Sequence, residues 1–231
     1  MRALRWVVGI FGDLCLTAGL VLLLFVGWQL WWTDVTANRE QSGTVQALTR
    51  DFGSGPTASA SAPPRTAPAA VAFGKAFAIL RIPRLGADYA RPILEGTGHD
   101  VLEQGLGHYH GTAMPGTVGN FAVAGHRTTY GRPLHDIDRL RAGDTIVVET
   151  KTTFSVYAVR RHVIVAPTQV DVLLPVPQKR GATPTVGTLT LTACHPKYSA
   201  AQRYVVFAEL VDTYPRSEGL PSGTLDTPKG T

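Results

Sequence analysis

Cysteine is scarce in this sequence of 231 residues, which contains only Cys15 and Cys194. Two cysteines exclude the small secreted folds that depend on several disulfide bonds. Runs of lysine and arginine are also missing, and the basic residues behind the formal net charge of +5 are scattered. The basic surplus therefore does not indicate a nucleic-acid-binding surface. Hydrophobic residues make up 44% of the chain and charged residues 17%, which excludes a disordered protein.

Charge is absent altogether from residues 14–32. About 20 apolar residues in a helix match the hydrocarbon thickness of a bilayer. Tryptophans gather at the end of the segment, where aromatic rings favour the headgroup region. A cleaved signal peptide is the alternative, but its apolar region would be shorter and a small-residue cleavage site should follow. We therefore predict an uncleaved transmembrane helix over residues 14–32.

The basic residues on either side of this segment predict its orientation. Arg2 and Arg5 precede it, whereas the first basic residue after it is Arg39. By the positive-inside rule, residues 1–13 form a short cytoplasmic N-terminus and everything after the span lies outside the cell. The sequence thus predicts a single-pass protein of the cell membrane.

The segment after the span has little that could pack. Residues 33–50 are compatible with a few further helical turns, but residues 53–70 are rich in Pro, Ala, Ser and Gly and have no periodicity. Such a segment cannot bury enough surface to offset its ordering entropy. We predict a stalk and flexible linker over 33–72, which lets an outer domain reach away from the membrane. The tail over 215–231 has a similar composition and is predicted to be disordered.

Residues 73–214 have the texture of one all-β domain, with short apolar or alternating runs bounded by Gly, Pro and Asp. Candidate strands are 76–82, 90–94, 120–125, 145–149, 153–165, 188–192 and 203–211. Candidate helices are short and cover 100–106 and 133–140. The strand over 153–165 is long enough to need a twist or a bulge. Many strands without alternating helices predict a closed or nearly closed β-barrel, with a β-sandwich as the alternative.

Cys194 is an unpaired thiol in a compartment that oxidises thiols, because Cys15 lies in or at the membrane. It closes the strand-like run over 188–194, and His195 and Pro196 follow immediately. A strand end presents a side chain at a rim, where a substrate can reach it. Cys194 is therefore a candidate nucleophile, and the alternative is a small buried apolar residue.

A thiol nucleophile needs a proton partner. Of the seven histidines, His126 ends an apolar strand as Cys194 does, and His110 and His108 are the next candidates. His195 is a poor partner because neighbouring strand residues point to opposite faces. His162 is predicted to be a surface residue.

A developing oxyanion needs a fixed donor, and Arg203 is the candidate. It lies nine residues after Cys194, at the start of the next strand, so that a hairpin would bring it beside Cys194. A guanidinium stays charged and donates two hydrogen bonds in one plane. The alternative is a salt bridge at a strand end.

These residues together resemble a known family. The run Thr-Leu-Thr-Ala-Cys over 190–194, with Arg203 downstream, resembles the Thr-Leu-x-Thr-Cys motif and following arginine of sortases. Residues 120–127 resemble the strand with their catalytic histidine. Gly-His-Arg-Thr-Thr-Tyr over 125–130, with Cys-His-Pro over 194–196, is similar to the class E sortases of actinobacteria. The resemblance covers residues 73–214.

The resemblance implies a sortase-type closed eight-stranded β-barrel with short helices, and a cysteine transpeptidase that uses no cofactor. Cys194 would attack the Thr–Gly bond of a C-terminal sorting signal and form a thioacyl intermediate. His126 would protonate the leaving amine and later deprotonate the acceptor, and Arg203 would hold the oxyanion. The implied partners are secreted proteins with that signal and an amino group of the peptidoglycan precursor or cross-bridge.

The class E resemblance also implies a Leu-Ala-x-Thr-Gly signal rather than Leu-Pro-x-Thr-Gly. Tyr130 is similar to the tyrosine tied to that preference, and would lie near the second substrate position; the alternative is an aromatic lid on the barrel rim. Ala193 stands where the motif has Thr, so that a hydroxyl and its substrate contacts are missing. His110 stands where Pro is expected and has no assigned role.

Two other classes of function compete with this one. An exported cysteine peptidase or hydrolase is the first, although papain-like enzymes place Cys before His, and here His126 precedes Cys194. A non-enzymatic, membrane-tethered domain that binds a cell-wall protein is the second, and it predicts an unreactive Cys194.

No metal site is predicted, because His108 and His110 lack a third ligand and no acidic cluster suits calcium.

Overall fold

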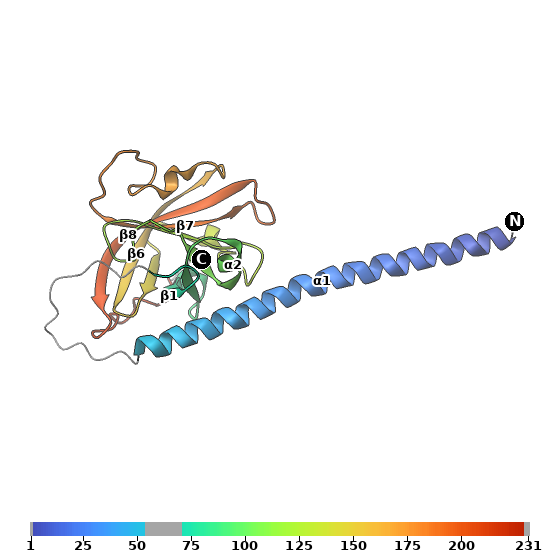
Figure 1. The fold of residues 1–231 in the computed structure, drawn as a ribbon, viewed down its shortest axis with the longest axis horizontal. Coiled ribbons are helices and arrows are strands. Elements are labelled where there is room, and N and C mark those ends of the chain that lie inside the picture. The colour runs from blue at the N-terminus through green and yellow to red at the C-terminus, as the bar shows by residue number, and fades with distance from the viewer. Residues whose placement is uncertain (1, 54–70, 229–231) are drawn as a thin grey trace.

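The computed structural model describes residues 2–53 and 71–228. A long helix, α1 (Arg2–Gly53), leads to a barrel of eight strands, drawn from teal to red in Figure 1. The strands are β1 (Ala76–Arg81), β2 (Ala90–Glu95), β3 (Leu106–His108), β4 (Gly119–Ala124), β5 (Thr145–Glu149), β6 (Thr153–Val165), β7 (Gly187–His195) and β8 (Gln202–Pro215).

The sheet is closed in the order β1-β2-β3-β4-β7-β8-β6-β5, which leaves no unpaired edge. The pairs β2–β3 and β4–β7 are parallel, and the other pairs are antiparallel. The prediction of a closed barrel is confirmed, and the alternative of a sandwich is wrong.

The predicted strands agree closely with the observed ones, and β5 and β6 have the predicted bounds. The ladder of β6 with β8 shifts register at two places, between Val156 and Tyr157 and between Val159 and Arg161, which confirms the expected irregularity. Strand β3 has no counterpart among the predicted strands, because Leu-Gly-His is too short to show any alternation.

The helices differ more from the prediction. The helix expected over 100–106 is α2 (His99–Gln104), which ends at Gly105 with φ of 158° so that β3 can begin. The helix expected over 133–140 is wrong: only one 3₁₀ turn, η2 (Ile137–Arg139), forms there. The backbone N–H of Leu134 donates back to the carbonyl of His126 at 3.0 Å, which holds this segment against the end of β4 instead of in a helical ladder. Two further 3₁₀ turns are η1 (Pro83–Leu85) and η3 (Val170–Leu173).

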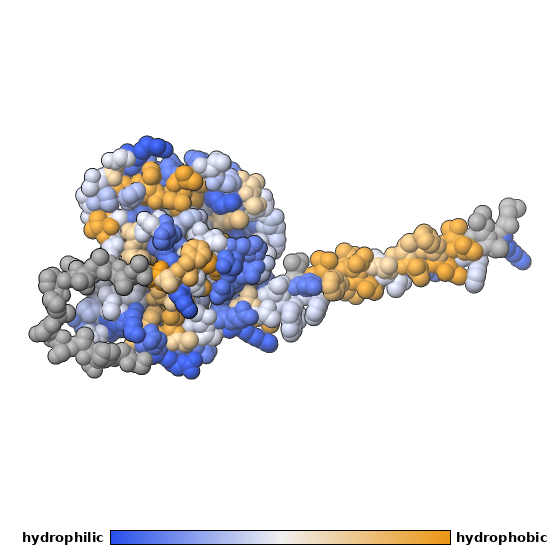
Figure 2. All heavy atoms as spheres, viewed as in Figure 1, coloured by the Kyte–Doolittle hydropathy of each residue, from blue (hydrophilic) through white to orange (hydrophobic). Residues whose placement is uncertain are grey.

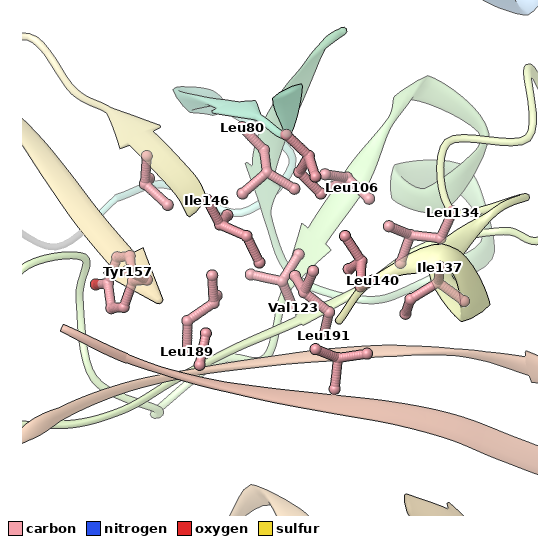
Figure 3. Packing of buried hydrophobic residues seen from close by; sticks show 14 of the residues in the cluster. Leu80, Leu106, Val123, Leu134, Ile137, Leu140, Ile146, Tyr157, Leu189 and Leu191 are labelled. Atoms are coloured by element: carbon pink, nitrogen blue, oxygen red, sulfur yellow. The ribbon is translucent and has the colours of Figure 1, made fainter. Parts of the chain in front are cut away.

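The core fills the barrel with aliphatic side chains and Tyr157. Figure 3 shows side chains such as Leu80, Val123, Ile146 and Leu189 pointing toward one another from different strands. Every residue of β4 is buried, because loops cover its outer face as well. Full burial of each aliphatic side chain contributes about 1.5–3 kcal/mol, so that this interior provides a rigid frame for the residues at its rim.

Helix α1 is longer than predicted. Its first half is apolar, exposed and projects away from the barrel, as Figures 1 and 2 show. This helix is long and apolar enough to cross a membrane. Its second half packs against the barrel and α2. Most of the less exposed residues there recur at helical spacing and form one stripe: Asp34, Ala37, Asn38, Gln41, Thr44, Val45, Leu48 and Phe52. The part of the predicted linker over 33–53 is therefore a docked helix, whereas residues 54–70 lie outside the described residues.

The segment after β8, for which the composition predicts disorder, begins as ordered turns. The backbone N–H of Arg216 donates to the carbonyl of Thr152 at 2.8 Å. The guanidinium of Arg216 lies over the rings of Phe52 and Phe154, at 5.0 and 4.8 Å from their centroids. Cation–π contacts of this kind order the first residues of the tail against α1 and β6.

Candidate functional site

Cys194 and Arg203 face each other across the β7–β8 ladder. Cys194 is the register partner of Arg203 in this antiparallel pair, which confirms the predicted hairpin. Both residues are half-buried. Nη1 of Arg203 donates to the carbonyls of Ala200 and Gln202, at 2.9 Å each, so that the local backbone holds the guanidinium at this end of the ladder.

His126 lies just beyond the end of β4, next to β7. The last register pair of these parallel strands is Ala124 with Thr192, and the N–H of Gly125 donates to the carbonyl of Thr192 at 3.1 Å. His126 and Cys194 each lie two residues beyond that pair. Parallel pairing therefore brings both to the same end of the barrel.

The other two candidate bases belong to a different group. His108 is buried in β3, and its Nδ1 lies 2.6 Å from Oε2 of the buried Glu95. His110 has an exposed side chain whose Nδ1 lies 2.7 Å from Oε1 of the same carboxylate. His108 pairs with Val123, inside the β4 ladder rather than at its end. Of the three histidines, the geometry favours His126 as the partner of Cys194.

The ring of His126 lies in a partly desolvated place. Its Nε2 is buried and has no hydrogen-bond partner among the described residues. Burial lowers the pKa of His126 below its ordinary value, and repulsion from His99 lowers it further, whereas Glu103 acts in the opposite direction. The neutral imidazole is therefore favoured in the free site.

Helix α2 contributes two residues that the sequence analysis missed. The ring of His99 lies 6.3 Å from that of His126, and its Nδ1 is 2.9 Å from Oε1 of Glu103. A hydrogen bond with Glu103 raises the pKa of Tyr130. The one signal in the sequence was the i, i+4 spacing of His99 and Glu103, which places them on one face of a short helix.

Tyr130 lies close to His126. Its ring centroid is 5.1 Å from that of His126 and 5.7 Å from that of His99. Ala193 lies elsewhere: it is 2% exposed and belongs to the apolar cluster inside the barrel. The structure therefore does not bring Ala193 to the rim group, because its side chain points to the opposite face of β7 from Cys194.

Arg127 is a third residue that the sequence analysis did not single out. It is 3% exposed, and its Nη1 donates to the carbonyl of Cys194 at 3.3 Å and lies 2.9 Å from Nδ1 of His195. Its Nη2 pairs with Asp138 at 2.8 Å. The residue that follows His126 thus ties the end of β4 to the end of β7.

The threonines of the 190–194 motif join strands rather than face the rim. The hydroxyl of Thr190 donates to Oδ1 of Asn120 at 2.6 Å. The amide of Asn120 in turn donates to the carbonyls of Val172 and Leu174, at 3.1 and 3.0 Å. All of Thr190 and nearly all of Asn120 is buried, so this part of the motif stabilises the β4–β7 pair.

A cavity of about 280 Å³ lies beside this site, between α1, η1 and the loop after β4. Its lining includes Asn38, Arg91, Gly131 and Arg132, and contains none of Cys194, His126 and Arg203. Over residues 2–53 and 71–228, no group of three or more His, Cys, Asp or Glu side chains is arranged to hold a metal ion.

Comparison with known proteins gives a consistent result. A family model described as a sortase domain matches residues 80–211. The chain is 38% identical over 222 residues to Sortase SrtE1 of Streptomyces coelicolor; the match covers 93% of the chain and 60% of that protein. It is 32% identical over 215 residues to Sortase SrtE2 of the same organism, and covers 89% of the chain and 83% of that protein.

Solved structures match the barrel. Sortase E from Streptomyces avermitilis is 45% identical with a TM-score of 0.61, over 67% of this chain and 99% of that one. Sortase E1 from Streptomyces coelicolor, solved with a tripeptide in its active site, is 40% identical with a TM-score of 0.60, over 66% of this chain and 98% of that one.

Proposed function

The chain belongs to the sortase family, and from this premise we propose that it is a cysteine transpeptidase whose reacting residues are Cys194, His126 and Arg203. The observation that carries the proposal is the register pair of Cys194 with Arg203, with His126 at the adjoining end of β4. A thiol, an acid–base group and a fixed cation are the three parts that acyl transfer through a thioester requires.

The first half of the reaction breaks the Thr–Gly bond of a sorting signal. The Cys194 thiol first passes its proton to the neutral ring of His126. The thiolate then attacks the threonine carbonyl carbon, and the guanidinium of Arg203 stabilises the oxyanion that forms. The imidazolium of His126 donates its proton to the glycine nitrogen as the C–N bond breaks. The thioacyl intermediate remains on Cys194, and the amine leaves.

The second half transfers the acyl group to an amine. The neutral ring of His126 takes a proton from the attacking amino group, a new amide forms, and the thiolate of Cys194 leaves. Burial favours this neutral form of His126 before substrate binds. We infer that the acceptor is an amino group of the peptidoglycan precursor or cross-bridge, as the class E resemblance implies.

The proposed signal is Leu-Ala-x-Thr-Gly. Support comes from Tyr130, whose ring lies 5.1 Å from that of His126 and hence beside the place where the scissile bond must lie. Sortase E1 from Streptomyces coelicolor holds a tripeptide in its active site, and a short extended peptide is the ligand proposed for the same region here.

The proposed location is the cell membrane, with α1 as a single span, the N-terminus inside and the barrel outside. The uncharged segment over 14–32 and the arginines before it support this orientation. A membrane-impermeant amine reagent should label barrel lysines such as Lys75 and Lys151 on intact cells. Labelling only after lysis would contradict the orientation.

The central experiment uses the full chain in detergent micelles with a Leu-Ala-x-Thr-Gly peptide and triglycine. Mass spectrometry should detect the ligated peptide, the released glycine fragment and a thioacyl adduct on the protein. Cys194→Ala should remove all three, whereas the matched variant Cys15→Ala should keep them.

The competing functions give different results in the same experiment. Release of the fragment without ligation, even at high amine concentration, would favour a peptidase or hydrolase. No adduct with either Ala or Pro at the second position would favour a binding domain with an unreactive Cys194.

A further inference from the structure

The docked half of α1 contacts the loop that follows His126 at two defined points. Oδ1 of Asp34 accepts a hydrogen bond from the backbone N–H of Gly131 at 3.1 Å. Nε2 of Gln41 donates to the backbone carbonyl of Tyr130 at 2.9 Å. The helix therefore provides a hydrogen-bond partner for both the carbonyl and the N–H of the peptide unit that joins Tyr130 to Gly131.

This turn has an unfavourable backbone. Tyr130, Gly131 and Arg132 have φ of 51°, 75° and 50°, three successive residues in the left-handed region. Residues with a Cβ rarely adopt that region, because the Cβ approaches the following carbonyl oxygen. Such a conformation persists only where surrounding contacts hold it.

The helix and the turn approach each other as closely as a glycine permits. A Cβ on Gly131 would lie 3.0 Å from Oδ1 of Asn38 and 3.2 Å from Nε2 of Gln41. Gln41 is completely buried in this contact, and Asp34 is also close enough to Arg132 for an ion pair, at 3.0 Å. The contact is thus built from a buried amide, a carboxylate and a glycine, and is more than a loose apposition of two surfaces.

The turn carries the aromatic ring of the site. Tyr130 places its side chain against His126 while its own carbonyl is held by Gln41. A change in the backbone at 130–132 would move this ring, since the ring follows the φ and ψ of its residue. The position of α1 therefore bears on the reacting end of the barrel.

We propose that Asp34 and Gln41 are positioning residues for the site: they hold the turn at 130–132 so that Tyr130 packs against His126, and so set the preference among sorting signals. The catalytic part of this inference rests on the proposed transpeptidase. On this view, the membrane anchor is part of the specificity site, and a barrel cut away from α1 has an altered selectivity.

The test compares Asp34→Ala and Gln41→Leu with Glu40→Ala, a control at an exposed position of the same helix, all as full chains in micelles. The first measurement is hydrogen exchange of the peptide that contains Gly131, without substrate. Loss of one hydrogen bond should speed exchange of the Gly131 amide about fivefold or more in Asp34→Ala. Asp34→Asn keeps an acceptor oxygen and should restore protection, and Glu40→Ala should match the parent chain.

The second measurement is the ratio of kcat/KM for Leu-Ala-x-Thr-Gly and Leu-Pro-x-Thr-Gly peptides. We expect Asp34→Ala and Gln41→Leu to change this ratio about fivefold, with Glu40→Ala unchanged. Faster exchange with an unchanged ratio would overturn the role in selectivity. Unchanged exchange in Asp34→Ala would overturn the proposal that α1 holds the turn at 130–132. A parent chain without activity would refute the proposed function, while the exchange measurement would still test whether α1 holds this turn.

Discussion

The two sides of the candidate site are built in different ways. Cys194 and Arg203 lie within one continuous antiparallel ladder, where β7 and β8 pair residue by residue. His126 and Tyr130 lie beyond the end of a strand, in a segment held by contacts from elsewhere: Arg127 from within, α2 from the side and α1 from outside. The ladder fixes its residues by its own hydrogen bonds, whereas the loop depends on side chains from distant parts of the chain.

This difference bears on how each side can fail. If the proposed roles hold, a substitution of Cys194 or Arg203 should remove a reacting group and leave the backbone geometry intact, because the backbone pairing does not depend on that side chain. A substitution among the loop's supporting residues changes the geometry first and the chemistry as a consequence.

The largest effect is expected on the ladder side. Arg203→Ala should lower kcat/KM about 10²–10³-fold, the typical cost of removing one donor to an oxyanion. Arg203→Lys keeps the charge but not the planar pair of donors, and should restore only part of the activity. The measurement is steady-state kinetics with the sorting peptide, alongside the melting temperature. A large fall in Tm would show that the Arg203 side chain supports the β7–β8 ladder, which would contradict the expectation that substitutions on the ladder side leave the geometry intact.

An intermediate effect is expected at Arg127 on the loop side. Arg127→Ala leaves the carbonyl of Cys194 without this donor and breaks the pair with Asp138. The expected loss in free energy of unfolding is about 1–3 kcal/mol, or several degrees in Tm. The control is Arg139→Ala, an exposed arginine 4.0 Å from Asp136, which should change stability by less than about 0.5 kcal/mol. Equal losses in free energy of unfolding in the two variants would contradict the view that Arg127 links the ends of β4 and β7.

The smallest effect is expected from the two α2 side chains that shift the pKa of His126. His99→Gln removes a repulsive charge and should raise that pKa, whereas Glu103→Gln removes an attractive one and should lower it. In the proposed mechanism the imidazolium protonates the leaving amine. The alkaline limb of kcat/KM should therefore move to higher pH in the first variant and to lower pH in the second. NMR titration of the His126 ring measures the pKa directly. A shift of both variants in the same direction would refute this account.

The ladder side could be read from the sequence to a large extent. Alternating apolar runs separated by turn residues predict β7 and β8, and the eight residues between Cys194 and Arg203 leave room for little except a hairpin. Local patterns suffice here, since each residue is placed by its own strand. On the loop side, only the strand end before His126 could be predicted, because an apolar run precedes it.

The loop side could not be read in this way. Arg127, His99 and Glu103 act through contacts that depend on how α2 and the β4 end meet in space, and no local pattern encodes that meeting. The docked half of α1 was missed because its stripe mixes Asp34, Asn38 and Gln41 with apolar residues, so that periodicity of hydrophobic residues alone does not reveal it. At Ala193 the sequence motif was misleading. Its position in the motif suggests a contact with substrate, but the alternation of side chains along β7 turns it into the barrel.

The parallel pairing of β4 with β7 also governs when the site can exist. The bond from Thr190 to Asn120 closes a segment of 70 residues, and the bond from Gly131 to Asp34 spans 97. Contacts so distant in sequence form slowly, because the entropy of closing a long loop must be overcome before they stabilise the chain. A growing chain thus holds its histidine long before its thiol, and the two can meet only once β7 has been made and has paired with β4. Unfinished chains therefore lack the complete group of Cys194, His126 and Arg203.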